Sequence, residues 1–450
     1  VVAALAGFWD IFRKQENAEK LHESHRLDGK TCIVTGANSG LGFAIAVEMA
    51  KRGAHVIMAG RSKIPEAGEL VKQKSGSDRV EMRYLDLSKI PSIHVFVDGL
   101  IRDGIKPAVT VLNAGVALPN SRKTESGQDE MFLVNYLSNV ILTNLMISKD
   151  VIPCNGNSNP RPRIIFISSD SHQGSSAIDY SEFGRYYEYG VSKGIENYSY
   201  FKLILNTYAT ELSRRVNPDG VHIGVNVICP GPVHTNIIKP APQPLRFILG
   251  AIFKIIFRSP AKAALPVIYM SVSSDFEGKS GEYLHMFNSK QMDPKVYIPE
   301  EGARLWEASM QVWQAIDPGQ NSVAAGSTGT SFPTWTGRIS SSKSAYLGRT
   351  GITFLKKDAG TGMVHERSIS SKSASLGVIG SRVIIGVFRV LLLFLSVGKP
   401  ETFPARRREM FNDKTRAKKR TGDFMASGFY IVLTYIRCIR IKKVTDGGCF

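Results

Sequence analysis

The segment TGANSGLG (35–42) decides the fold that we predict for this chain. It overlaps the end of TCIVTG (31–36), a run typical of a buried strand, and it opens a long helical pattern. Gly36, Gly40 and Gly42 have the spacing G-x-x-x-G-x-G. Small residues at such a turn let a phosphate group approach the free N–H groups at the start of a helix, where the helix dipole also favours an anion. The segment therefore predicts a dinucleotide-binding turn.

Strand-like and helix-like patterns alternate from Lys30 to about Phe287. Most of the strand-like runs are continuous, apolar and rich in Val and Ile, which is typical of strands buried on both faces of a parallel sheet. This alternation predicts an α/β fold with a doubly wound, Rossmann-type parallel sheet. The strand-like runs after the first are HVIMAG (55–60), VEMRYLDL (80–87), VTVLNAG (109–115), RIIFISS (163–169), VHIGVNVICPG (221–231) and EYLHMF (282–287).

The composition divides the chain into three parts. We expect residues 28–316 to form a single catalytic domain that closes around LWEASMQVWQAIDPG (305–319). The chain begins at Val1 without a methionine, so truncation of the N-terminal segment, residues 1–27, stays open. Its opening VVAALAGFW is either the end of a lost hydrophobic anchor or the first turns of a surface helix. Residues 317–450 form a Ser/Gly-rich basic tail of low complexity, and this composition is typical of disorder.

The net charge of +18 comes almost entirely from the tail. Residues 321–450 hold 22 Lys and Arg against 7 Asp and Glu, whereas residues 1–320 hold 35 against 32. Two apolar patches in the tail, 383–398 and 428–439, are each shorter than the ~20 residues of a spanning helix. Contact of the tail with a membrane surface stays open beside simple disorder. Nucleic acid is not an expected partner, because no known reader motif accompanies the charge.

The cysteines bear on the compartment. They are odd in number and have no metal-ligand spacing, so we expect a reducing compartment and no metal site. No secretory signal with a cleavage site is visible. We therefore expect a cytoplasmic or peripherally membrane-associated protein that is not secreted. The five cysteines are Cys32, Cys154, Cys229, Cys438 and Cys449.

The end of the second strand bears on the choice of cofactor. The sequence there is AGRS, which offers Arg61 and no carboxylate. An Asp or Glu at this place binds a free ribose 2′-hydroxyl, whereas an Arg accommodates a 2′-phosphate. We therefore predict that NADP(H) is preferred over NAD(H). A solvent-exposed surface charge is the alternative role for Arg61.

Several motifs resemble, in their order, the signature set of the short-chain dehydrogenase/reductase family. They are TGANSGLG, the Asp86-Leu87 pair after the third strand, and Asn-Ala-Gly (113–115) after the fourth. The resemblance covers roughly residues 28–316. It implies that Asp86 contacts the adenine, that the Asn-Ala-Gly segment supports the cofactor and the sheet, and that a later Pro-Gly pair and Thr lie near the nicotinamide. The cofactor-binding residues that we predict are Gly36, Asn38, Ser39, Gly40, Leu41, Gly42, Arg61, Asp86, Leu87, Asn113, Ala114, Gly115, Tyr198, Lys202, Pro230, Gly231 and Thr235.

Reduction of a carbonyl by NADPH needs a proton donor near the oxygen and a polar group that holds it. In the resembled family these roles fall to a Ser after the fifth strand, a Tyr and a Lys on the next helix, and an Asn on the preceding helix. RIIFISSD offers Ser168 and Ser169, and the match to the family's strand end selects Ser169. Asn135 in LVNYLSN matches the Asn, which would help to position the Lys and a relay water. A cap or helix-face role is the alternative for each residue alone.

Two Tyr–Lys pairs compete for the catalytic role in YGVSKGIENYSYFK (189–202), and in each pair the residues are four apart, as on one helix face. A helix that begins near Tyr189 would contain two glycines, each of which costs ~1 kcal/mol relative to Ala. A helix that begins near Tyr198 runs to NPDG without Gly or Pro, and we predict this start.

The family resemblance agrees with this choice. KLILNTYATELSRR is similar to the retinol-dehydrogenase-like branch of the family, which implies Tyr198 as the general acid/base and Lys202 as its activator and ribose contact. One departure keeps the Tyr189–Lys193 pair as an alternative. The family often has Ser just before the Lys, and here Lys202 follows Phe201, whereas Lys193 follows a Ser.

The segment KPAPQPLRFILGAIFKIIFRSP (239–260) lies where the family places its variable substrate-covering region. Its dense apolar and basic residues fit a lipophilic pocket or a membrane surface, while an ordinary core helix is the alternative. With the retinol-dehydrogenase-like resemblance, it predicts a lipophilic alcohol or carbonyl substrate such as a retinoid, steroid or polyprenol. Peripheral membrane contact and a homodimer stay open. A cofactor-binding scaffold without turnover is the alternative function, and the intact catalytic set argues against it.

Overall fold

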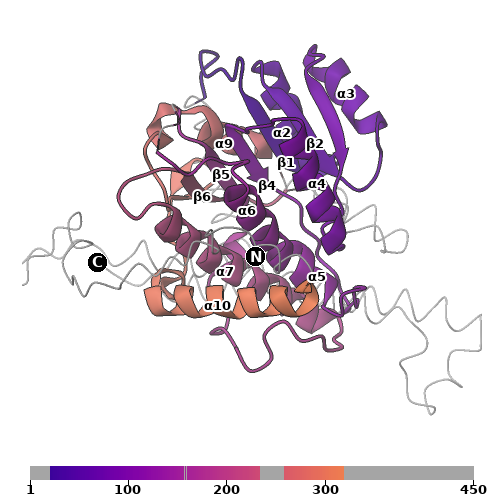
Figure 1. The fold of residues 1–450 in the computed structure, drawn as a ribbon, viewed down its shortest axis with the longest axis vertical. Helices are drawn as coiled ribbons and strands as arrows, with labels where there is room; N and C mark the ends of the chain where they lie inside the picture. The colour runs from indigo at the N-terminus through magenta and orange to yellow at the C-terminus, as the bar shows by residue number, and fades with distance from the viewer. Residues whose placement is uncertain (1–20, 157, 159, 234–257, 319–450) are drawn as a thin grey trace, which may run out of the picture. The chain divides into compact units, whose positions relative to one another are not determined.

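The computed structural model describes residues 21–156, 158, 160–233 and 258–318 (Figure 1). In this part of the chain the strands form one sheet in the order β3-β2-β1-β4-β5-β6-β7-β8. Every neighbouring pair is parallel except β7 and β8. The predicted doubly wound parallel sheet is therefore confirmed. The strands are β1 (Thr31–Thr35), β2 (His55–Gly60), β3 (Val80–Tyr84), β4 (Val109–Leu112), β5 (Arg163–Ile167), β6 (Gly224–Cys229), β7 (Tyr283–His285) and β8 (Asn288–Ser289).

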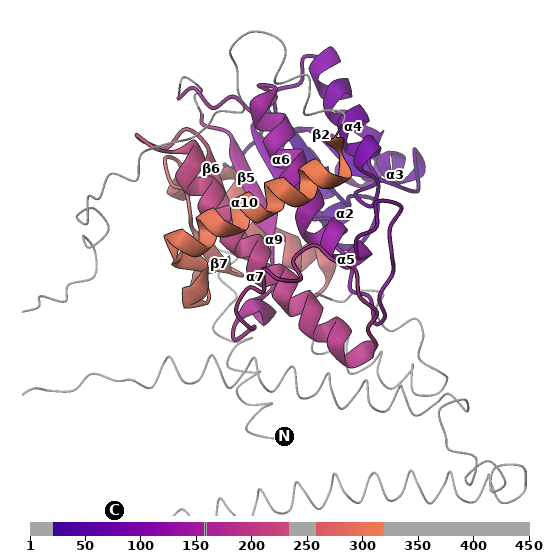
Figure 2. The ribbon, with the colours of Figure 1, turned by 60° about the horizontal axis from the view of Figure 1, so that its bottom comes forward.

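Helices cover both faces of the sheet (Figures 1 and 2). On one face lie α2 (Gly40–Lys51), α3 (Glu66–Ser75) and α9 (Pro260–Val272). On the other lie α4 (Ile90–Arg102), α6 (Ser138–Ser148) and α7 (Val191–Val216), and α10 (Pro299–Ile316) packs against α7. The shorter elements are α5 (Glu130–Phe132), the π-helical turn η2 (Leu133–Leu137), and the 3₁₀ turns η3 (Asp170–His172), η5 (Ser274–Phe276) and η6 (Pro294–Tyr297).

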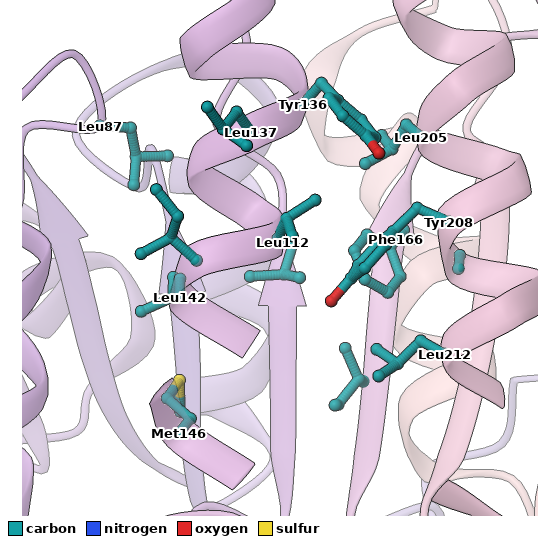
Figure 3. Close-up of a cluster of buried hydrophobic side chains, with 14 of the residues drawn as sticks. Leu87, Leu112, Tyr136, Leu137, Leu142, Met146, Phe166, Leu205, Tyr208 and Leu212 are labelled. Atoms are coloured by element: carbon teal, nitrogen blue, oxygen red, sulfur yellow. The ribbon is translucent and has the colours of Figure 1, made fainter. Parts of the chain in front are cut away.

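The strands are apolar on both sides because both sides are buried. In β1, Cys32 and Val34 belong to the core beneath α2, whereas Ile33 belongs to the core on the opposite face. Figure 3 shows part of this second core, in which Phe166 of β5 and Leu112 of β4 lie near side chains of α6 and α7. Side chains on alternate sides of a strand face opposite layers, so a run without polar residues is what a central strand requires.

One helical stretch is apolar and long enough to cross a membrane by length and composition alone. It runs from Glu130 to Ser148 through α5, η2 and α6. In the described fold, however, 83% of its most apolar window is buried inside the protein. It is therefore the core helix of a globular domain, with Tyr136 and Leu137 packed in the core shown in Figure 3.

The predicted start, near Tyr198, of the helix that carries Tyr198 and Lys202 was wrong. Helix α7 begins at Val191, with Gly190 as its N-cap and Gly194 inside it. A Cβ at Gly194 would lie 2.6 Å from the carbonyl oxygen of Leu118, so only glycine lets this loop pack against the helix. Tertiary packing thus offsets the poor helix propensity of glycine, which is a weak preference that contacts often override.

Candidate active site

The glycine-rich turn is shaped by contacts on one side and open on the other. Gly36 has a φ of +64°, and a Cβ there would lie 2.9 Å from the Cα of Ala114. A Cβ at Gly42 would lie 2.5 Å from the carbonyl oxygen of Gly36. Gly40 has a φ of +58°, and a Cβ there would meet no protein atom within 4 Å. Two glycines therefore let the turn fold closely, and the third faces open space.

The open side of this turn suits an anion. Ser39 is the N-cap of α2, but its side chain makes no capping hydrogen bond. Because the first N–H groups of a helix have no partner within the helix, they remain available here to a phosphate. Asn38 lies within this turn and donates a hydrogen bond from Nδ2 to Ser62 Oγ at 2.8 Å. The turn thus fits the diphosphate of a dinucleotide, with Leu41 in the first turn of α2.

The Asn-Ala-Gly segment (113–115) is hydrogen-bonded to the end of β1. Thr35 Oγ1 accepts hydrogen bonds from the backbone N–H groups of Asn113 and Ala114, both at 3.0 Å. Asn113 also donates from Nδ2 to the Thr35 carbonyl at 2.9 Å. A Cβ at Gly115 would lie 3.2 Å from Asn135 Oδ1. The Asn-Ala-Gly segment therefore joins β1, β4 and the helical turn that carries Asn135. Thr35, which accepts two of these hydrogen bonds, was not among the predicted site residues.

Arg61 lies among carboxylates at the ends of β2 and β3. Its Nη1 is 3.7 Å from Asp86 Oδ1 and 3.6 Å from Glu130 Oε1, and its side chain is half exposed. Asp86 Oδ1 accepts hydrogen bonds from the backbone N and the Oγ of Ser88, at 3.0 and 2.7 Å. Leu87 is buried and accepts a hydrogen bond at its carbonyl from Ser138. The sequence reasoning did not select Glu130, which comes close to Arg61 only through the fold.

Ser168 and Ser169 differ in environment. Ser169 caps η3, and its Oγ accepts a hydrogen bond from the backbone N of Ser171 at 3.3 Å. Ser168 Oγ is buried and has no hydrogen-bond partner. Both residues follow β5 directly, so they lie at the carboxyl edge of the sheet, where ligands bind in open α/β sheets.

A buried histidine braces the turn that carries Ser169. His172 Nδ1 is 2.8 Å from the Ser169 carbonyl, and Nε2 lies 3.2 Å from the backbone N of Asp293. Since Nε2 must accept the Asp293 N–H, Nδ1 carries the proton and donates to Ser169. Burial lowers the pKa of His172, which favours this neutral form. The sequence reasoning missed His172; its only signal is its place three residues after Ser169.

Asp170 anchors the same turn from the other side. Its carboxylate accepts hydrogen bonds from Lys290 Nζ at 2.6 and 2.8 Å and from Tyr283 at 3.2 Å. Burial opposes its ionisation, but the charges of His285 and Lys290 outweigh this effect, so the pKa of Asp170 is lowered. Ser169 thus lies in a turn that the buried His172 connects to Asp293 and the partly buried Asp170 connects to Tyr283 and Lys290.

Tyr198 and Lys202 lie one turn apart on α7. Lys202 is buried, and its Nζ donates a hydrogen bond to the Ile167 carbonyl at 2.8 Å. The same Nζ lies 5.8 Å from the centre of the Tyr198 ring. Burial lowers the pKa of Lys202 to about 8 and raises that of Tyr198 to about 12. A phenol that is protonated at neutral pH and a nearby ammonium suit a proton donor and its activator.

The competing pair is not assembled in this way. Tyr189 precedes α7, and its hydroxyl donates a hydrogen bond to Asp129 Oδ2 at 2.9 Å. Burial and the Asp129 charge raise the pKa of Tyr189. Lys193 is exposed and pairs with Glu196 at 3.3 Å. The two side chains of this pair therefore have separate partners, and Tyr189 is held by a carboxylate.

Asn135 lies in the π-helical turn between α5 and α6 and is buried. Its side chain accepts from the Val116 N–H at 2.7 Å and donates to the Val116 carbonyl at 2.8 Å. The Asn135 carbonyl accepts from Asn139 Nδ2 at 3.2 Å. Turns of this type are rare inside helices and frequent at functional sites.

The last predicted motif is described only in part. Gly231 follows β6 and Pro230 with a φ of +83°, and a Cβ there would lie 3.0 Å from Met286 Sδ. Thr235 lies outside the described residues, as does the predicted substrate-covering segment 239–260 except for its last three positions. The predicted tail lies outside them beyond residue 318.

Comparisons with known proteins identify the family of this chain. The family model described as short chain dehydrogenase matches residues 30–245. Human polyprenol dehydrogenase is 30% identical over a match that covers 64% of this chain and 86% of that protein. Mouse retinol dehydrogenase 13 is 32% identical, with 64% of this chain and 84% of that protein covered. Mouse retinol dehydrogenase 14 is 31% identical, with 63% and 85% covered. The chain therefore belongs to the short-chain dehydrogenase/reductase family, in its retinol-dehydrogenase-like branch.

Proposed function

We propose that this oxidoreductase interconverts a lipophilic alcohol and its carbonyl, with NADP(H) as the cofactor. The observation that carries the proposal is the Tyr198–Lys202 pair on α7, in which the buried Lys202 Nζ is hydrogen-bonded at the end of β5 and lies 5.8 Å from the centre of the Tyr198 ring. When bound, the dinucleotide would supply or accept the hydride. The chain would then have to move a proton to or from the substrate oxygen.

Three residues would share this proton chemistry, and a fourth would position the segment that supports the cofactor. Tyr198 would donate the proton to the forming alkoxide, because its raised pKa keeps it protonated until the cofactor and substrate are in place. Lys202 would favour the phenolate that this step leaves. Ser169 Oγ would hold the substrate oxygen. Asn135 would keep the cofactor-supporting segment and the neighbouring helix in register, since the Oδ1 of its side chain accepts from the Val116 N–H and its Nδ2 donates to the Val116 carbonyl.

The preference for NADP(H) rests on the ends of β1 and β2. Asn38 of the glycine-rich turn is hydrogen-bonded to Ser62, which follows Arg61 in the chain, and these residues would offer a cation and polar groups to a 2′-phosphate. In Arg61→Asp, the new carboxylate would repel a 2′-phosphate and suit a free 2′-hydroxyl. The preference should therefore move towards NAD(H), and an unchanged preference would remove Arg61 from this role.

The lipophilic substrate is proposed from the relatives and from the sequence of 239–260. The matched relatives carry the names retinol dehydrogenase and polyprenol dehydrogenase, and both names denote lipophilic alcohols. A cytoplasmic or peripherally membrane-bound location, with the catalytic domain at 28–316, would suit such a substrate. A homodimer would also be compatible with this activity.

The experiment is an assay of the full chain with NADPH and NADH against a panel of lipophilic aldehydes and ketones, including retinoid, steroid and polyprenol compounds. Turnover of at least one carbonyl, faster with NADPH, would support the proposal. Binding of NADPH without turnover of any panel member would favour the alternative, a cofactor-binding scaffold.

A further inference from the structure

Glu130 is a buried carboxylate placed between two arginines at the edge of the expected adenosine site. It is the first residue of α5, and its side chain is only 7% exposed. Its Oε2 lies 3.0 Å from Arg122 Nε, and its Oε1 lies 3.6 Å from Arg61 Nη1. Arg122 thus holds the carboxylate in position, while Arg61 stands at its other oxygen.

These contacts change the electrostatics around Arg61. Arg61 and Arg122 bring two positive charges to the group, and Asp86 and Glu130 bring two negative charges. The group is therefore neutral before any anion arrives. An anion that binds Arg61 must also approach two carboxylates, and the buried Glu130 is poorly screened by solvent and salt.

We propose that Glu130 is a specificity-determining residue that reduces the preference for a dinucleotide with a 2′-phosphate over one with a free 2′-hydroxyl. The inference rests on the proposed function, in which Arg61 meets the adenosine ribose. The negative charge of Glu130 would offset the positive charge that Arg61 presents to the cofactor. A free hydroxyl carries no charge, so the carboxylate penalises one cofactor and leaves the other unaffected.

Glu130 suits this role better than Asp86 does. Asp86 lies two residues after the end of β3 and accepts hydrogen bonds from the backbone N and the Oγ of Ser88, and the family resemblance implies that it contacts the adenine. A change at Asp86 would therefore alter the binding of both dinucleotides. Glu130, in contrast, lies near Arg61 with one carboxylate oxygen and pairs with Arg122 through the other.

The test is the binding of NADPH and NADH to the full chain, measured by titration calorimetry without substrate. In Glu130→Gln, Arg61 loses one opposing charge, so the Kd for NADPH should fall about three- to tenfold while that for NADH stays the same. Arg122→Gln should act in the opposite direction. It leaves Glu130 with Arg61 as its partner, and NADPH should therefore bind more weakly.

Glu125→Gln is the matched control. Glu125 pairs with Lys89 at 2.7 Å, but its side chain is 77% exposed, so solvent screens its charge. This variant changes the net charge of the protein by the same amount and should leave the ratio of the two Kd values unchanged. Thermal unfolding of each variant establishes that it is folded, and Arg122→Gln tests the inference if Glu130→Gln does not fold.

Two results would overturn the inference. One is an equal change, or no change, in both Kd values for Glu130→Gln; the other is a shift of the ratio in the same direction for Glu130→Gln and Arg122→Gln. Failure of the wild-type protein to bind either dinucleotide is a different result. It would refute the proposed function itself, and the inference with it, before any variant is compared.

Discussion

The ammonium nitrogen of Lys202 lies 2.8 Å from the carbonyl oxygen of Ile167, the last residue of β5. This hydrogen bond ties the middle of α7 to the strand end two residues before Ser169. The Lys202 ammonium group is thereby held at the carboxyl edge of the sheet, next to the segment that carries Ser169, and its nitrogen lies 5.8 Å from the centre of the Tyr198 ring. The cost of burying an ammonium group is visible in the lowered pKa of Lys202.

Replacement of Lys202 by Met should change how stability depends on pH. Burial lowers the pKa of Lys202 from 10.5 to about 8, so between these values the unfolded chain holds a proton that the folded chain has released. Stability of the wild type should therefore rise with pH in this window, relative to the variant, by up to about 3 kcal/mol. Urea unfolding of both proteins at about pH 7 and about pH 10 measures this difference. A difference that does not vary with pH would contradict the prediction.

Two alanine substitutions in the glycine-rich turn should have different effects. Gly40→Ala places a methyl group in open space, at a φ that costs about 1–2 kcal/mol, so the fold should survive. The methyl group would nevertheless occupy the space where the phosphate approaches, and the Kd for NADPH should rise about tenfold or more. Gly42→Ala places its methyl group 2.5 Å from the Gly36 carbonyl and should destabilise the fold itself. Thermal unfolding and NADPH titration separate the two effects; tight NADPH binding by Gly40→Ala would refute the placement of the cofactor.

His172 should act as a positioning residue for Ser169. In His172→Phe the hydrogen bond to the Ser169 carbonyl is lost, and kcat should fall about 10- to 100-fold with the Kd for NADPH unchanged. His172→Asn keeps an N–H donor near the place of Nδ1 and should recover part of the rate. Equal rates for the wild type and His172→Phe would show that the turn holds without this bond.

Because of His172, we expect the free energy of unfolding to decrease in acid. The pKa of His172 is lowered in the folded protein, so as the pH falls from 6.5 towards the folded value the unfolded chain takes up a proton first. Stability of the wild type should therefore fall through this window. The His172→Phe variant should lack this component when unfolding is followed by circular dichroism at several pH values.

The sequence was sufficient for the sheet, and the reason is physical. Central strands such as β1 and β5 are buried on both faces, so they must be continuous apolar runs, and such runs are visible without a structure. Strand β8 has two residues and was not predicted, because so short an element has no period. The start of α7 was predicted wrongly, because the contact of Gly194 with the 118–119 loop depends on residues that are distant in sequence.

Residues of the candidate site can be selected from the sequence where a motif lies in one short segment. The glycine-rich turn and the Tyr198–Lys202 spacing are local, and the structure places them at the carboxyl edge of the sheet. The partners of these residues were not predictable. His172 accepts a hydrogen bond from Asp293, which lies 121 residues later in the sequence. Glu130 likewise comes close to Arg61 only in the folded protein. The π-helical turn at Asn135 also gave no signal, since LVNYL reads as ordinary helix.

The choice between the two tyrosines is the central claim, and single-turnover kinetics with a lipophilic aldehyde that the wild type reduces test it most directly. Tyr198→Phe should still bind NADPH, because the phenol hydroxyl is the only group removed, but the rate should fall about 10²- to 10⁴-fold. Tyr189→Phe is the matched control. It loses the hydrogen bond to Asp129, so it should be about 1 kcal/mol less stable and yet react within about threefold of the wild-type rate. Substantial reduction by Tyr198→Phe, or loss of the reaction in a folded Tyr189→Phe protein that binds NADPH, would contradict the assignment.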